Sequence, residues 1–202
     1  MSIEQTGDYP WDGTIGWTIA NGSDHALRFG VRIPAWSDGA RTLLVDGSPN
    51  TTAPEDGIVY VTVDAHSDMT VTLELPMEAK LVRASNRVKE TVGQVALMRG
   101  PIVYCAESCD NPGPLWLYTV NPGEAASAEH DEGLLGGVTV VRQPAWRQPE
   151  DPETQPLYVP ATPRPREACE VTMVPYYTWA NRDEGQMRVW LPCAPYEADT
   201  NR

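Results

Sequence analysis

Four cysteines are the residues of this chain that first invite a chemical role, because thiolates hold zinc in tetrahedral sites or pair as disulfides. Cys105 and Cys109 form a C-x3-C pair, which is wider than the C-x2-C spacing of a zinc knuckle. Cys169 and Cys193 supply no second pair at a matching spacing, and His130 lies 21 residues beyond Cys109. The sequence therefore predicts no zinc site among these residues, and we expect reduced, buried thiols.

The histidines and glycines offer little support for nucleophilic or nucleotide chemistry. Only three histidines are present, and His25 and His66 fall at expected turns. The sequence has no G-x-S-x-G element, in which a serine nucleophile occupies a sharp turn, and no G-x-x-x-x-G-K-[ST] loop for phosphate. We therefore predict neither an acyl-transfer site nor a nucleotide site.

Carboxylates are abundant, with Asp+Glu 28, and paired carboxylic acids are the usual machinery of glycoside hydrolysis. Most of them fall in expected turns or in the loops after Glu124, where solvated surface charges are expected. Glu107 and Asp110 stand apart because they follow the apolar run 95–105, but capping of a turn is the favoured role for both. We therefore assign no catalytic, cofactor-binding or metal-binding residue in this chain.

The tryptophans raise a second chemical role, because exposed aromatic rings on a β-sandwich can stack on sugars. Their positions do not form one stripe with a period of two, and most adjoin proline or aliphatic residues. Packing in a core or between domains is therefore the favoured role for each of Trp11, Trp36, Trp116, Trp146, Trp179 and Trp190.

The elements that must carry these residues are β-strands. Between Trp17 and Leu75 apolar and polar residues alternate with a period of two, which is typical of half-buried strands. Tight turns, which favour residues that tolerate a positive φ, are expected at Asn21-Gly22, Asp46-Gly47 and Asp56-Gly57. This region is predicted to contain five or six antiparallel strands.

The second half of the chain begins a new block after residue 80. Pro101 should interrupt the apolar run 95–105, because proline cannot donate a hydrogen bond to a sheet. Residues 121–137 and a proline-rich loop at 144–165 read as irregular, and strands are expected at 138–141, 170–174 and 187–191. The predicted fold is all-β, with two consecutive antiparallel β-sandwich (jelly-roll-like) domains at residues 1–79 and 80–202.

Composition bounds the class of protein. The chain has 202 residues, a formal net charge of −13 and 41% hydrophobic residues, which is typical of a folded globular protein. The acidic balance argues against binding to nucleic acid or to an anionic membrane surface, since both attract clustered Lys and Arg. No apolar run spans a bilayer and no export signal is recognised, so we expect a soluble, cytoplasmic protein.

Several segments resemble the C-terminal β region of glycoside hydrolase family 127, the family of β-L-arabinofuranosidases. The longest and most specific is GQVALMRGPIVYCAE at 93–107, followed by Asp110-Asn111. The shorter segments run in the family's order along nearly the whole chain: YPWDG at 9–13, RIPAW at 32–36, VDG at 45–47, LELPM at 73–77, PYYTWANR at 175–182 and MRVW at 187–190. Two departures are VDG, where the family often has Val-Asn-Gly, and the proline-rich stretch 144–165.

The resemblance implies a plan in which an N-terminal (α/α)6 barrel carries the active site and two β-sandwich domains follow it. It also implies a retaining mechanism with a zinc-held cysteine nucleophile and a glutamate acid/base, all within the barrel. We expect this chain to begin after the barrel, so the catalytic barrel is absent and no cofactor or metal residue carries over to it. Cys105, in particular, receives no catalytic role from the motif.

The expected function is therefore that of a non-catalytic β-sandwich part of a family 127-like β-L-arabinofuranosidase, inactive by itself. Its expected partner is a family-type (α/α)6 barrel in cis or in trans, with a homodimer and an arabinose-containing glycan as further candidates. A free-standing carbohydrate-binding or structural module is the alternative. We also expect the isolated chain to expose an apolar patch and to self-associate.

Overall fold

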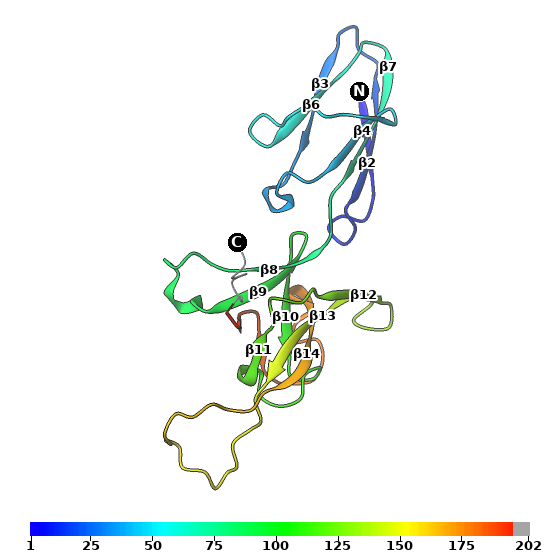
Figure 1. Cartoon of the computed structure of the whole chain (residues 1–202). Helices are drawn as coiled ribbons and strands as arrows, with labels where there is room; N and C mark the ends of the chain where they lie inside the picture. Colours follow the sequence, from blue (N-terminus) through cyan, green and yellow to red (C-terminus); the bar gives the residue numbers. More distant parts are fainter. Residues whose placement is uncertain (196–202) are drawn as a thin grey trace. The chain divides into compact units, whose positions relative to one another are not determined.

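The computed structural model describes residues 1–195 and confirms an all-β fold (Figure 1). The chain divides into two compact units, Met1–Glu78 and Ala79–Arg202, and residues 196–202 of the predicted second domain lie outside the described part. Helical structure in the described part is limited to short 3-10 turns: η1 (Ala35–Ser37), η2 (Lys89–Thr91), η3 (Leu115–Leu117) and η4 (Tyr176–Thr178). No helix in this part has the length and apolar character that crossing a membrane would require.

The first unit has two antiparallel layers. A five-stranded sheet has the order β1-β2-β7-β4-β5, and a separate pair is formed by β3 and β6. The strands are β1 (Ser2–Thr6), β2 (Thr14–Asn21), β3 (Leu27–Arg32), β4 (Thr42–Val45), β5 (Ser48–Pro49), β6 (Ile58–Val63) and β7 (Ser67–Glu74).

The core of the first unit lies between these layers, and the sequence alternation explains it. Val59, Val61 and Val63 of β6 are buried on one face, and Leu73 of β7 is buried opposite them in the same cluster. Residues two apart in a strand point to the same side, so the predicted apolar face becomes the inner face. The sequence analysis did not predict β1, because all five of its residues are exposed and form no buried apolar face.

The predicted turns were right at two of three sites. Asp46-Gly47 and Asp56-Gly57 both adopt positive φ angles, as a tight reversal requires. Asn21 instead ends β2 as a buried residue, and its amide donates hydrogen bonds to the backbone carbonyls of His25 and Asp64. Asn21 therefore closes a longer connection through its side chain.

The strands of the second unit are hydrogen-bonded into one nine-stranded sheet, whose main path is β11-β13-β14-β10-β9-β16. The two ends of this path meet where Val120 bridges Cys193, so the sheet closes around a shared apolar core. The strands are β8 (Ala79–Val82), β9 (Gln94–Arg99), β10 (Ile102–Glu107), β11 (Tyr118–Val120), β12 (Ser127–Asp131), β13 (Val138–Arg147), β14 (Glu167–Pro175), β15 (Met187–Arg188) and β16 (Leu191–Pro192).

The position of Pro101 was predicted correctly, since it lies in the turn between β9 and β10. The boundaries predicted for the proline-rich loop at 144–165 were wrong at its start. Pro144 lies inside β13, opposite Glu170 of β14, and β13 continues to Arg147. The opposite edge of β13 pairs with β12 before Pro144 and with β11 after it. Pro144 itself has no strand partner on that edge, so its lack of a backbone N–H costs no hydrogen bond there.

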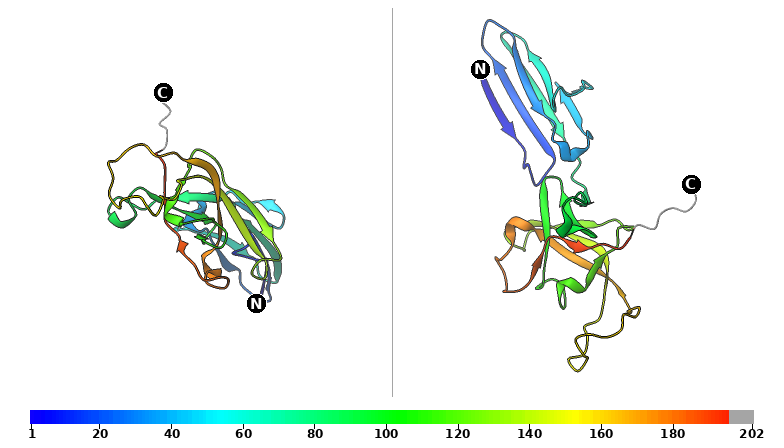
Figure 2. Two further views of the ribbon diagram at one scale, coloured as in Figure 1. Left: turned by 90° about the horizontal axis from the view of Figure 1, so that it is seen from below. Right: turned by 90° about the vertical axis from the view of Figure 1, so that its left-hand side faces the viewer.

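The remaining loop, 148–166, projects from the sheet of the second unit as an extended excursion (Figure 2). The prediction that 121–137 is irregular was also wrong, because β12 pairs with β13 within it. The five residues of β12 are all exposed, so the segment lacks the apolar alternation that reveals a strand. The predicted strand at 187–191 is two short strands, β15 on β10 and β16 on β9.

Candidate functional site

The residues that could do chemistry meet at the end of β10. The strand ends at Glu107, and the segment that follows η4 returns beside it. Together they form a pocket of about 270 Å³, lined by Glu107, Ser108, Cys109, Trp179, Ala180, Arg182, Asp183, Glu184, Gly185 and Gln186. Two segments more than seventy residues apart in sequence thus build one concave site.

Arg182 pairs with both carboxylates that the sequence analysis singled out. Its guanidinium binds Asp110 through two bonds of 2.7 and 2.5 Å and also pairs with Glu107. The Glu107 and Asp110 side chains are only 5% and 19% exposed, so these charges are largely withdrawn from water. The hydrogen bond to Asp110 is the main reason that the pKa of Arg182 is raised, and Arg182 therefore stays cationic.

The predicted role of Glu107 and Asp110 as turn caps was incomplete. Their carboxylates are held by Arg182, and Glu107 also accepts a bond from the Ala180 N–H at 3.3 Å. The residue that secures the turn is the buried Asn111, whose amide donates to the carbonyls of Glu107 and Thr172 at 2.8 and 2.9 Å. Sequence reasoning missed Arg182, because no local pattern links positions so far apart.

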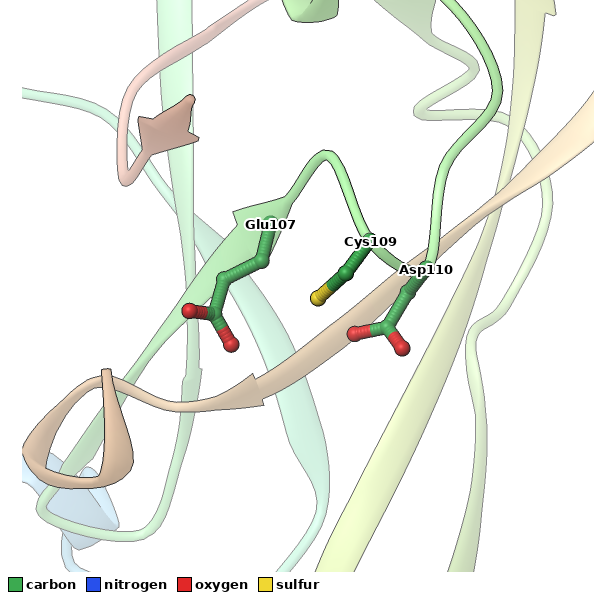
Figure 3. Close-up of side chains that lie close together, drawn as sticks. All are labelled: Glu107, Cys109 and Asp110. Carbon is green, nitrogen blue, oxygen red and sulfur yellow. The ribbon is translucent and has the colours of Figure 1, made fainter. Parts of the chain in front are cut away.

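Glu107, Cys109 and Asp110 also have the donor types of a metal site. Their nearest ligand atoms lie within 4.8 Å of one another, and Figure 3 shows the three side chains on one side of the loop. The residues do not fit a metal ion well, because the Arg182 cation already satisfies the two carboxylates. Burial, followed by the Asp110 charge, raises the pKa of Cys109, which disfavours the thiolate that a metal needs.

The cysteines are all free thiols, as the sequence analysis expected. Only Cys105 is fully buried, where burial raises its pKa to about 12. The expectation of burial was wrong for Cys109, which is exposed, while Cys169 and Cys193 are half-buried. A high thiol pKa and an inaccessible position make Cys105 a packing residue.

The predicted packing role of the tryptophans holds for some of them. Trp36 packs against the core of the first unit, whereas Trp11, Trp116 and Trp179 are 47%, 58% and 44% exposed. Trp179 lies at the pocket, and its ring is parallel within 7° to that of Tyr176, with the centroids 6.2 Å apart. The sequence spacing could not reveal this pair, because a 3-10 turn rather than a strand positions it.

The histidines form no catalytic group with these residues. His66 contacts Asp24 at 2.9 Å on the exposed surface of the first unit, and His130 lies on β12. Within residues 1–195 the buried Glu107 and the half-buried Asp110 share one arginine, so each carboxylate is held in an ion pair. The fold and the site define an all-β chain of two compact units, with a polar pocket that has Trp179 in its lining.

Comparison with known proteins places this chain in a family. Residues 1–77 match the middle domain of the family 127 β-L-arabinofuranosidases, and residues 79–192 match the family's C-terminal domain. The chain therefore belongs to glycoside hydrolase family 127, as the motifs had predicted. It corresponds to the middle and C-terminal domains of a larger enzyme, and not to its catalytic domain.

The relatives are much longer than this chain. A non-reducing end β-L-arabinofuranosidase of Bifidobacterium longum subsp. longum is 47% identical over 197 residues, which cover 94% of this chain and 30% of the relative. The crystal structure of a family 127 β-L-arabinofuranosidase from Geobacillus stearothermophilus T6 is 33% identical and superposes with a TM-score of 0.85, covering 95% of this chain and 30% of that one. A second family 127 β-arabinofuranosidase structure gives 28% identity and a TM-score of 0.80, covering 95% and 31%.

Proposed function

We propose that this chain is the non-catalytic β-domain part of a β-L-arabinofuranosidase and supports a catalytic (α/α)6 barrel. The observation that carries the proposal is the pair of domain matches, which account for nearly the whole chain while the chain spans about 30% of its relatives. Hydrolysis and the zinc of the family would then belong to the barrel. The paired state of Glu107 and Asp110 agrees with a supporting role.

Exposed apolar side chains support contact with a further protein surface. Leu157 and Tyr158, in the middle of the 148–166 loop, are 95% and 94% exposed, and Val159 follows at 51%. Adjacent apolar residues left in water are a typical feature of a surface that is covered in an assembly. We propose the barrel, in cis or in trans, as the covering surface, with a second copy of this chain as the alternative.

Association in trans tests this role. The catalytic part of the Bifidobacterium longum relative, produced without its own β domains, is mixed with this chain and examined by analytical ultracentrifugation. We expect a one-to-one complex in which the catalytic part is more stable to heat than alone. A chain that stays monomeric, or that forms only homodimers, and leaves the catalytic part unchanged would contradict the supporting role.

Binding of an arabinose-containing glycan is a second candidate function, which the chain could perform as a free-standing module. It is favoured by the exposed, parallel rings of Tyr176 and Trp179 beside the polar pocket. We also propose a cytoplasmic location, which the four unpaired cysteines support, because reducing compartments preserve free thiols.

A further inference from the structure

The pocket at the end of β10 combines an aromatic edge with a polar, acidic lining. We propose that it is a binding site for one neutral sugar ring, with Trp179 as the stacking surface and the carboxylates of Asp183 and Glu184 as acceptors for sugar hydroxyls. This inference rests on the proposed function only for its choice of sugar. The site itself is argued from the residues of the pocket.

The aromatic edge is exposed and held in place. Trp179 is 44% exposed although its ring has a parallel neighbour in Tyr176, so much of the indole remains open to a ligand. A hydrogen bond fixes the turn η4, which precedes Trp179: the buried Thr178 hydroxyl donates to the Pro175 carbonyl at 2.7 Å. An aromatic surface that is held by a parallel ring and a hydrogen-bonded turn suits the flat apolar face of a sugar at little entropic loss.

The acceptors lie next to this edge. Asp183 and Glu184 follow Arg182 directly, line the pocket and are exposed. The terminal nitrogens of Arg182 pair with Glu107 and Asp110, while its buried Nε has no hydrogen-bond partner. Ionised carboxylates accept hydrogen bonds strongly, and sugar hydroxyls are donors. The same charges would repel a uronic acid, so the site should select a neutral sugar.

The wall of the pocket is built for a fixed shape. Ser108 and Gln186 are joined by two hydrogen bonds, from the Ser108 N–H to the Gln186 carbonyl at 3.0 Å and from the Gln186 N–H to the Ser108 hydroxyl at 2.9 Å. A Cβ on Gly185 would lie 2.2 Å from the Ser108 hydroxyl oxygen, so a larger residue there would displace the hydroxyl that accepts from the Gln186 N–H. The volume of about 270 Å³ lies just below the usual range for small-molecule pockets, about 300–1,000 Å³, and suits a monosaccharide.

The test is titration of the purified chain with methyl β-L-arabinofuranoside, followed by NMR chemical shifts and tryptophan fluorescence. We expect saturable binding with a Kd on the order of 1 mM, which is a free energy of about −4 kcal/mol. Trp179→Ala should weaken binding at least about tenfold. The matched control is Trp116→Ala, which removes another exposed tryptophan of the second unit and should leave the Kd unchanged.

Further probes separate sugar recognition from other causes. Asp183→Asn with Glu184→Gln should weaken sugar binding, and galacturonate should not compete with the neutral sugar. Tetramethylammonium tests a cation site, since an acidic pocket with an aromatic edge could also hold a cation. The proposal is overturned if the wild type shows no saturable sugar binding, if Trp179→Ala binds as well as wild type, or if the ammonium probe binds and the sugar does not.

The outcome is distinguishable from that of the association test. Loss of sugar binding in Trp179→Ala with an intact complex to the catalytic part supports the sugar site. The wild type could instead fail to bind sugar while Trp179→Ala abolishes the complex with the catalytic part. That result would assign Trp179 to the protein interface. That second result would overturn the sugar site and leave the supporting role standing.

Discussion

Arg182 joins two segments of the family motifs, the end of VYCAE and the end of PYYTWANR, through its bonds to Glu107 and Asp110. Replacing it with methionine would leave two carboxylates largely withdrawn from water without their cation. Removing one partner of such a pair destabilises a protein by about 3–5 kcal/mol, and we expect Arg182→Met to lower the free energy of unfolding by that amount. Urea denaturation followed by circular dichroism measures it.

The matched control is Arg142→Met, which breaks a surface pair with Glu129 and should cost less than about 1 kcal/mol. Adding Glu107→Gln and Asp110→Asn to Arg182→Met should restore part of the loss, because the unpaired charges are then gone. Equal losses for Arg182→Met and Arg142→Met would show that the cluster contributes no more than an exposed ion pair.

Burial of Cys105 predicts a loss of stability at alkaline pH. The folded state raises its pKa from 9.0 to about 12, so below pH 9 both states keep the proton. Between pH 9 and 12 the unfolded chain releases the proton more readily, and the free energy of unfolding falls. Cys105→Ala should therefore flatten the decline measured by denaturation across this range. Burial also raises the pKa of Tyr104 to about 12, so this residue keeps part of the pH dependence in the Cys105→Ala variant.

The control for this pH dependence is Cys109→Ala, which removes an exposed thiol whose pKa is raised less than that of Cys105, so the slope should change less than in Cys105→Ala. A Cys105→Ala slope identical to that of the wild type would show that the thiol does not titrate differently in the folded protein.

At the residue scale, the sequence singled out Glu107 and Asp110 but did not predict that both pair with Arg182. An apolar run before a pair of acids marks a strand end, and this much is local information. Their partner, Arg182, lies 75 residues from Glu107 and 72 residues from Asp110, so the contact depends on how β10 and β14 pair. The exposure of Cys109 and Trp179 depends on the same tertiary arrangement.

The 148–166 loop is the element most open to cleavage, because it holds the highly exposed Leu157 and Tyr158. We predict that brief chymotrypsin treatment cuts first at these residues, which mass spectrometry locates. The nicked chain should remain one species on size-exclusion chromatography, since β13 and β14 stay paired over seven residue pairs from Val141↔Met173 to Arg147↔Glu167.

Replacing Leu157 and Tyr158 with glycine is the control and should slow this first cut. Cutting that begins elsewhere, or a nicked chain whose fragments separate without denaturant, would contradict the description of a loop on a stable strand pair.

Strands with a buried face were predictable from the sequence, whereas exposed strands were not. β6 shows its alternation of valines directly, and its inner face is buried as expected. β1 and β12 are exposed throughout, so pairing with a neighbour, and not burial, defines them. Proline content marked the loop but placed its start too early, because Pro144 fits a position where β13 lacks a partner on one side.

At the scale of the molecule, the first unit contains a complete core of its own within residues 15–75. A fragment of residues 1–78 should therefore fold alone, as domains of this size can. We expect dispersed NMR signals and one cooperative thermal transition for the fragment. The comparison is the same fragment with Val59→Asp, which places a charge in the core and should abolish the transition.

A wild-type fragment without cooperative unfolding would show that the first unit depends on the remainder of the chain. It would also contradict the assignment of a self-contained core to residues 1–78.

The proposed division of labour within the enzyme is tested most directly by hydrolysis. The purified 202-residue chain is incubated with an aryl β-L-arabinofuranoside, with zinc and a reducing agent present, and release of the aryl group is measured. The non-catalytic role predicts no release above the buffer control, and release once a catalytic family 127 part is added. Turnover by the chain alone, abolished by substitution of Glu107 or Asp110, would place catalysis in the β domains and contradict that role.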